Sequence, residues 1–227
     1  MSETFKSQIK DLVDDLKAVF THVGLGGEAA EYKLLTQSFL YKFLNDKFLY
    51  QAKAIDASNS YEKLIDMSEE DYSWILKFIG TSTAWLKPDQ LIESLHRKQN
   101  ESDFYETFEN TLNQIAIDNN DIFSVHTDGD TAIRLFDERL ITDTISDSSK
   151  RNEVAKAIIN LLARVKFDET IFSQGFDFFS TLFEYMIKDY NKDGGGKYAE
   201  YYTPHSVAKI IADILVGDDK PQNVRIY

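Results

Sequence analysis

Hydrophobic residues recur every three or four positions through most of this chain, the spacing that gives an α-helix one apolar face. Little of the sequence predicts a β-strand before residues 224–227, which have the composition of a strand start. The segment 135–145 leaves helix and loop both open. The pattern predicts a mainly α fold, with helices over residues 5–20, 28–50, 61–67, 69–79, 88–95, 104–115, 150–166, 172–186 and 203–216.

Polar residues and glycines mark several helix ends. Ser68 precedes three acidic residues, which predicts an N-cap with acids in the first turn. Ser148 or Ser149 is placed to cap the helix that follows. The glycine-rich segment 24–27 ends the first helix. The helix over 28–50 carries an aromatic stripe, and such a stripe is more often core than a ligand box.

Composition and charge narrow the class of protein. The 227 residues are 43% hydrophobic and include no cysteine, which excludes disulfides and thiolate zinc sites. No apolar run reaches the roughly 18 residues of a membrane span, and the N-terminus lacks the apolar core of a secretory signal. We therefore expect a cytoplasmic protein.

The formal net charge is −13, which argues against a module that binds DNA by itself. The first 165 residues hold 18 basic and 28 acidic side chains, and the remainder holds 7 and 10. If the protein acts on DNA, most phosphate contacts must come from a further part of the protein or from a partner. The short basic run His96-Arg97-Lys98 fits a helix C-terminus, where the dipole favours cations, better than a DNA contact.

Most familiar catalytic and metal-binding patterns are missing from the sequence. Asp128-Gly129-Asp130 superficially resembles a calcium loop but lacks the glutamate at position twelve, so a solvated loop is expected over 118–130. The histidines are isolated in sequence, and we expect no metal site. Neither a Ser-His-Asp signature nor a phosphate-binding G-x-x-x-x-G-K motif occurs.

The stretch 194–216, GGGKYAEYYTPHSVAKIIADILV, is the part of the sequence that most suggests a ligand-binding site. Thr203 is placed as an N-cap and Pro204 as the first residue of a helix. The N-terminus of a helix offers unpaired N–H groups and the positive end of a dipole, which attract a carboxylate or phosphate. Tyr201 and Tyr202 are placed to wall a small ligand. The alternative is an ordinary capped surface helix whose tyrosines pack in the core.

Two elements carry a resemblance to a known family. A-E-Y-Y-T-P, residues 199–204, resembles the G-E/Q-F/Y-F/Y-T-P element of the modification (methylase) subunits of type I restriction–modification systems. Residues 177–186, DFFSTLFEYM, are similar to that family's D-x-x-G-x-x-Y-E-Y-L helix. Ser180 and Ala199 stand where the family usually has glycine. A looser likeness runs from Phe136 to Phe167, at the family's joint between helical region and catalytic domain.

The resemblance implies a fold and an activity. It implies a helical N-terminal domain over residues 1–165 and the start of an α/β, Rossmann-like methyltransferase domain over residues 166–227. The full-length protein is then a DNA (adenine-N6) methyltransferase that uses S-adenosyl-L-methionine. The resemblance places six residues at the cofactor: Glu200, Tyr201, Tyr202, Thr203, Pro204 and His205. The family's D-P-x-x-G-x-G and N-P-P-Y/F motifs do not occur here, so no catalytic residue is assigned and we expect the chain alone to be inactive.

The resemblance also implies partners: DNA, a specificity subunit, a second methylase subunit and a restriction (motor and nuclease) subunit, with no membrane. Because residues 224–227 begin a strand and a lone strand cannot satisfy its backbone groups, we expect the chain to be the N-terminal part of a longer protein. The alternative interpretation is a non-catalytic, acidic helical module that binds protein partners. The net charge favours it, and the paired elements at 177–186 and 199–204 disfavour it.

Overall fold

The computed structural model describes residues 3–81, 83–123, 125–126, 132–167, 172, 185, 203 and 205–216. The chain divides into two compact units, Met1–Leu182 and Phe183–Tyr227. This division does not test the predicted boundary between residues 165 and 166, which stays a prediction.

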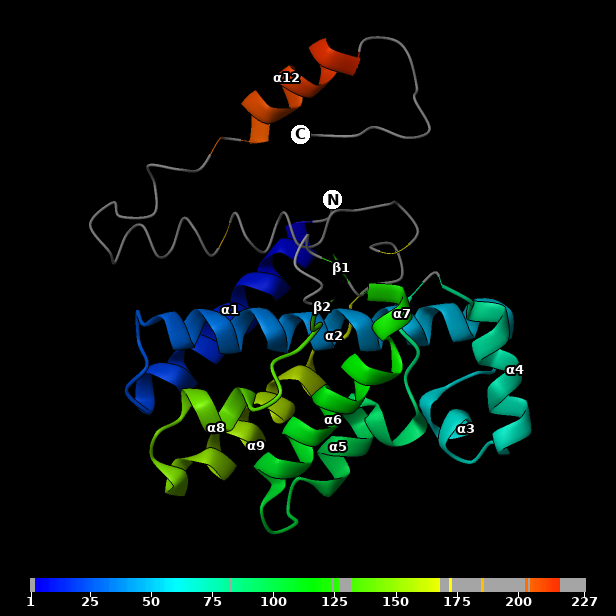
Figure 1. The fold of residues 1–227 in the computed structure, drawn as a ribbon, viewed down its shortest axis with the longest axis horizontal. Coiled ribbons are helices and arrows are strands. Elements are labelled where there is room, and N and C mark those ends of the chain that lie inside the picture. The colour runs from blue at the N-terminus through cyan, green and yellow to red at the C-terminus, as the bar shows by residue number, and fades with distance from the viewer. Residues whose placement is uncertain are drawn as a thin grey trace. The chain divides into compact units, whose positions relative to one another are not determined.

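The described part of the first unit is mainly helical, as the periodicity predicts (Figure 1). Two short strands, β1 (Val125–His126) and β2 (Ala132–Ile133), pair antiparallel, with Val125 opposite Ile133. The helices are α1 (Glu3–His22), α2 (Ala29–Ile55), α3 (Tyr61–Ile65), α4 (Glu69–Ile79), the 3-10 helix η1 (Pro88–Gln90), α5 (Ile92–Lys98), α6 (Phe104–Asp118), α7 (Asn120–Phe123), α8 (Leu140–Thr144) and α9 (Ser148–Arg164).

Helix α2 is the centre of this unit. It contacts α1, α4, α8 and α9, and Figure 1 shows it running across the whole helical body. Because neighbours cover it on several sides, its buried residues do not form a single stripe, and polar ones are among them. The helix also continues to Ile55, five residues beyond the predicted end. Its fully buried apolar residues are Leu34, Leu35, Phe39, Tyr41, Phe48 and Ala52.

Helix α1 follows its sequence pattern closely. Leu12, Val13, Leu16 and Phe20 are almost completely buried, and α1 packs on α9 and α2. The helix ends as the glycines predict. Gly24 has a φ of 90°, a conformation that costs a glycine little, and its backbone N–H donates to the carbonyl of Thr21 over 3.0 Å.

The helix caps agree with the sequence at one site and differ at another. Ser68 caps α4 as predicted, its hydroxyl accepting from the N–H of Asp71 over 3.2 Å. Helix α9 begins at Ser148, and its N-cap is Asp147 rather than either serine. The Asp147 carboxylate accepts from both the N–H and the hydroxyl of Ser149, at 3.0 and 2.6 Å. The hydroxyl of Ser149 therefore serves as a donor to the cap.

The connection between α4 and α5 is held by buried side chains. Tyr72 donates from its hydroxyl to the carbonyl of Leu86, and Tyr41 donates to that of Gln90, both over 2.6 Å. Burial raises the pKa of Tyr41 well above its ordinary value, so the phenol keeps its proton. The Asn119 side chain accepts from the N–H of Trp85 and donates to its carbonyl. It thus makes the two hydrogen bonds that a residue of a paired β-strand would make. These side chains thereby hold the connecting segment in place on both sides of Pro88.

Three predictions of the sequence differ from the structure or lie outside its described part. The segment 118–130 is not wholly loop, because α7 and β1 lie within it, and part of 135–145 forms α8. In the second unit only Tyr185, Thr203 and α12 (His205–Val216) are described. The strand predicted from residue 224 and most of the helix predicted over 172–186 fall outside the described residues, so the α/β, Rossmann-like segment stays a prediction.

Candidate functional site

The six residues predicted at the cofactor are only partly described. Thr203 is exposed and non-helical, and His205 is the first residue of α12. The helix thus begins directly after the Thr-Pro pair, within a residue of the predicted start. Glu200, Tyr201, Tyr202 and Pro204 lie outside the described residues, as does the side chain of His205. The structure therefore does not test whether these six residues meet.

Two features of helix α12 are described, one at its start and one along its apolar side. Its first turn contains no acidic residue, so no carboxylate of that turn neutralises the positive end of the dipole. Its apolar side chains are exposed, by 44% at Val207 and 79% at Leu215. A 12-residue helix with this apolar face needs an apolar neighbour to be stable in water.

Just after the predicted domain boundary, the chain leaving α9 is fixed to α2. The backbone N–H of Phe167 donates to Asp46 Oδ2 over 3.0 Å. The ring of Phe172 lies against two rings of α2, with centroids 5.7 Å from Phe43 and 5.4 Å from Tyr50. Phe167 itself is 6% exposed. The route of the chain at these two residues is therefore set by contacts with the central helix.

A buried ion pair supports this contact. Lys42 Nζ lies 2.9 Å from Asp46 Oδ2, and the two side chains are 3% and 10% exposed. Burial lowers the pKa of Lys42, while the charge and hydrogen bond of Asp46 act in the opposite direction. The ammonium also lies 5.5 Å from the centre of the Phe167 ring. Removing one partner would leave a buried charge uncompensated, which makes the pair intolerant of single substitutions.

Asn45 extends the cluster to α5. Its amide donates to Asp46 Oδ1 over 2.8 Å, and its Oδ1 accepts from the N–H of Ile92 over 2.9 Å. That N–H belongs to the first residue of α5, where no intrahelical acceptor exists. One turn of α2 thereby binds the start of α5 and the segment after α9.

A cleft of about 360 Å³ opens beside this cluster. Its lining combines aromatic rings with charges of both signs, and these include Lys42, Asp46, Lys53, Glu62, Glu93 and Lys166. Because acids and bases are mixed, the lining does not select one sign of ligand charge. Its chemistry fits a junction between helices better than a catalytic centre.

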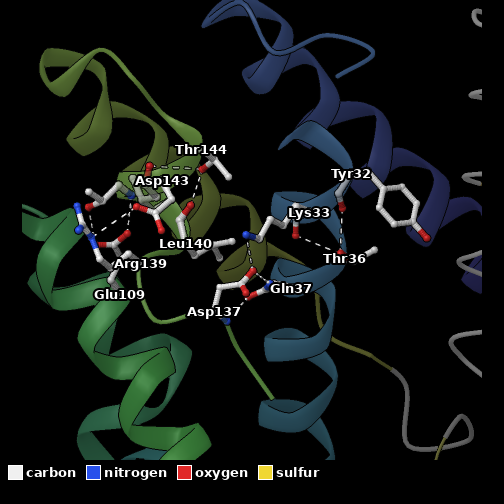
Figure 2. A network of polar contacts seen from close by, with 12 residues as sticks. Tyr32, Lys33, Thr36, Gln37, Glu109, Asp137, Arg139, Leu140, Asp143 and Thr144 are labelled. Carbon is white, nitrogen blue, oxygen red and sulfur yellow. Dashed lines mark hydrogen bonds and ion pairs between the residues drawn. The ribbon is translucent and has the colours of Figure 1, made fainter. Parts of the chain in front are cut away.

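A second polar network joins α2 and α6 to the segment around α8 (Figure 2). Asp137 contacts Gln37 through its side chain and its backbone N–H, and Lys33 Nζ lies 2.9 Å from Asp137 Oδ2. On α6, Glu109 accepts from the N–H and the hydroxyl of Thr142, at 2.6 and 2.8 Å. Phe136, which directly precedes Asp137, is also buried, so the start of the region that resembles the family's joint is firmly attached to the helical body.

The comparison with protein families gives a match to the C-terminal part of the chain. A family model described as N-6 DNA Methylase matches residues 174–227. This part of the chain is therefore similar to the N-6 DNA methylase family. The match spans both elements of the resemblance, 177–186 and 199–204, and leaves the helical body unmatched. No curated protein and no solved structure gives a significant match to the chain.

The basic run His96-Arg97-Lys98 makes contacts within the helical body. His96 Nε2 lies 3.0 Å from Asn160 Oδ1. Arg97 lies 3.5 Å from Glu93 and stacks over the Tyr61 ring at 4.9 Å. Two members of the basic run therefore have structural partners.

Among the described residues there is no group of three or more potential metal ligands, and no described helix is long and apolar enough to cross a membrane.

Sequence reasoning missed the Lys42–Asp46–Asn45 cluster. The available signal was a lysine and an aspartate four residues apart within a predicted helix, together with an asparagine on a neighbouring position. The same signal occurs on many exposed helices. Only the packing of α5 and of Phe167 over this turn of α2 turns it into a buried anchor.

Proposed function

We propose that the chain is the N-terminal part of the modification subunit of a type I restriction–modification system. In this proposal the whole enzyme transfers a methyl group from S-adenosyl-L-methionine to N6 of adenine in duplex DNA, in the cytoplasm. The family match across residues 174–227 carries the proposal, because it contains both elements of the resemblance. The helical body that precedes the match fits the same domain order.

The proposal assigns the cofactor pocket's edge to residues 200–205. The free N–H groups at the start of α12 bind the carboxylate of the methionine moiety, helped by the absence of acids in the first turn. Tyr201 and Tyr202 wall the pocket, and Thr203 fixes the start of the helix. When bound, S-adenosyl-L-methionine supplies the methyl group on a sulfonium. Because the transfer is an in-line displacement, the contribution of these residues is positioning.

Adenine must leave the base stack before its amine can be reached. The net charge of −13 provides little attraction for phosphates, so the proposal assigns most DNA contacts to the specificity subunit and to the rest of the enzyme. A second methylase subunit and the restriction subunit complete the assembly.

The test is a methylation assay on the protein encoded by the complete gene, co-expressed with the specificity subunit encoded beside it. Radiolabelled methyl from S-adenosyl-L-methionine should appear in duplex DNA as N6-methyladenine. The 227-residue chain alone should transfer none. Label on cytosine, or label in DNA treated with the chain alone, would contradict the proposal.

A binding measurement tests the pocket separately. In the same complex, Tyr202→Ala should weaken S-adenosyl-L-methionine about tenfold, because an aromatic wall is lost. The control is Tyr32→Ala, which removes a tyrosine that is 39% exposed on α2. Equal affinity in both variants would place the pocket elsewhere.

A non-catalytic interaction module is the second candidate, favoured by the acidic charge and by exposed aromatic residues on α4. It predicts a gene that ends without the D-P-x-x-G-x-G and N-P-P-Y/F motifs and a complex that transfers no methyl group. Reading the coding sequence beyond Tyr227 distinguishes the two.

A further inference from the structure

Helix α4 carries two apolar stripes, and the fold uses one of them. Tyr72, Ile75 and Ile79 are buried by 94% or more on the side that packs against α2. Trp74 and Phe78 lie on the other side and are 54% and 69% exposed. Four residues apart on a helix, these two side chains are neighbours, and their ring centroids are 6.1 Å apart. Nothing in the folding of this unit requires a second stripe.

The surroundings of this outer face of α4 (Trp74 and Phe78) are ordered. Trp85 is 36% exposed and its indole N–H donates to the carbonyl of Gly80, the residue that ends α4, over 2.5 Å. The backbone of Trp85 is held by Asn119. Lys77 lies over the Trp74 ring, 5.3 Å from its centre. Aromatic side chains that are already fixed lose little entropy on binding and are the usual anchors of protein interfaces.

The charges around the outer face select the partner. Residues 61–80 contain five acidic and two basic side chains, and Glu70 stands one turn before Trp74 on the same row of the helix. One of the two bases, Lys63, is paired with Asp56 at 3.0 Å. The other is Lys77, which covers Trp74. The exposed aromatic face therefore lies in an acidic field.

That field argues against two other occupants. Single-stranded nucleic acid also stacks on aromatic rings, but its sites run along a positively charged groove. A second copy of this chain, joined so that the two α4 helices run parallel, would bring the acidic first turns of both helices together. An apolar segment that carries lysine or arginine can pack its apolar side chains on the rings and place its cations near the carboxylates.

We propose that the outer face of α4 binds an apolar, lysine- or arginine-bearing helix of another protein. The rings of Trp74 and Phe78 receive its apolar side chains, and Glu70 attracts its cations. The proposal does not depend on the methylase assignment.

The chain offers a built-in reporter for the test, because its two tryptophans are Trp74 and Trp85. The probe is a 16-residue helical peptide with leucines at helical spacing and lysines elsewhere, titrated into the full chain while tryptophan emission is recorded. The matched peptide keeps the leucines and has glutamates in place of the lysines. We expect a blue shift and saturable binding with the lysine peptide and none with the glutamate peptide.

Variants locate the contact. Phe78→Ser should weaken the lysine peptide about tenfold or more, as loss of an interface anchor does. Glu70→Lys should weaken it as well, and added salt should reduce the remaining affinity. Ile117→Ser, at a position that is 55% exposed on α6, is the matched control and should leave binding unchanged. Urea unfolding confirms that each variant is folded.

Four outcomes would overturn the proposal. They are equal affinity for the two peptides, affinity unaffected by Phe78→Ser, tighter binding of a single-stranded oligonucleotide at the same tryptophans, and self-association in ultracentrifugation that Phe78→Ser abolishes. The last would identify a second copy as the occupant. Methyl transfer by the whole enzyme is not a readout here, so its failure leaves this test intact.

Discussion

Helices α1 and α12 have the same kind of sequence and opposite environments. Both carry apolar residues at helical spacing. Leu12 and Leu16 in α1 are 2% and 0% exposed, whereas Ile210 and Ile214 in α12 are 58% and 74% exposed. The difference shows that a periodic pattern specifies which face of a helix is apolar, while burial depends on the neighbours that the rest of the protein provides.

The polar residues give the same lesson within the helical body. Lys42–Asp46 and Lys63–Asp56 are both lysine–aspartate pairs at about 3 Å, yet the first is almost fully buried and the second is about half exposed. Burial determines whether such a pair is an anchor of the fold or a surface contact. Single substitutions can therefore test the comparison between the buried residues of the helical body and the exposed residues of α12.

The largest effect is expected at the buried pair. Asp46→Ala should lower the free energy of unfolding by about 3–5 kcal/mol, because Lys42 loses its partner and the N–H of Phe167 its acceptor. Lys63→Ala, at the exposed pair, should cost at most about 1 kcal/mol. Urea unfolding of the 227-residue chain measures both, and equal losses would remove the distinction between the pairs.

The next test addresses α1 and α12 directly. Leu16→Ala should cost about 2–5 kcal/mol, because it leaves a cavity under α9. Ile214→Ala in α12 should change the unfolding of this chain by about 0.5 kcal/mol or less. In the longer methyltransferase that the proposed function implies, the same Ile214→Ala is expected to become costly. If it stayed neutral there, α12 would have no apolar neighbour in the whole protein either.

A smaller effect is expected for the connection before α5. Asn119→Ala removes the amide that pairs with the N–H and carbonyl of Trp85. Asn119 is 1% exposed, so the loss should cost about 1–3 kcal/mol. Tryptophan emission should also shift to the red as Trp85 gains access to water. A change in stability without that shift would mean that Trp85 is held by other contacts.

The cap of α9 provides a finer test. Asp147→Ala should cost about 1 kcal/mol, because the first turn loses the acceptor for the N–H of Ser149. Ser149→Ala keeps that backbone contact and should cost less. If thermal unfolding showed a larger loss of stability in Ser149→Ala than in Asp147→Ala, Ser149 would be the cap.

The smallest effect concerns pH. Hydrogen bonds from the N–H and the hydroxyl of Ser58, and from Lys63, lower the pKa of Asp56 to about 2. A depressed carboxyl pKa adds stability that is complete above the ordinary value of 3.8 and is lost as the pH falls through about 2. Nuclear magnetic resonance should show Asp56 titrating near pH 2, and nearer its ordinary value in Ser58→Ala. An unchanged midpoint in that variant would exclude Ser58 as the cause.

The sequence by itself determined the long helices of the body, the glycine end of α1, the Ser68 cap and the start of α12 after Thr203–Pro204. These features depend on residues within a few positions of one another, so local periodicity and capping chemistry are enough to predict them. The resemblance at 177–186 and 199–204 likewise rests on short stretches, and the family match covers both. The contacts of Glu200, Tyr201 and Tyr202 stay predictions.

Tertiary structure alone decided which of these surfaces are covered. The sequence of α4 does not distinguish Tyr72 and Ile75, which face α2, from Trp74 and Phe78, which face solvent, because all four are apolar and lie on one short helix. Nor does it show that Asp46 accepts from Phe167, 121 residues later in the chain. Such contacts depend on where distant helices pack, and the free energy of burial belongs to that packing rather than to any local pattern of residues.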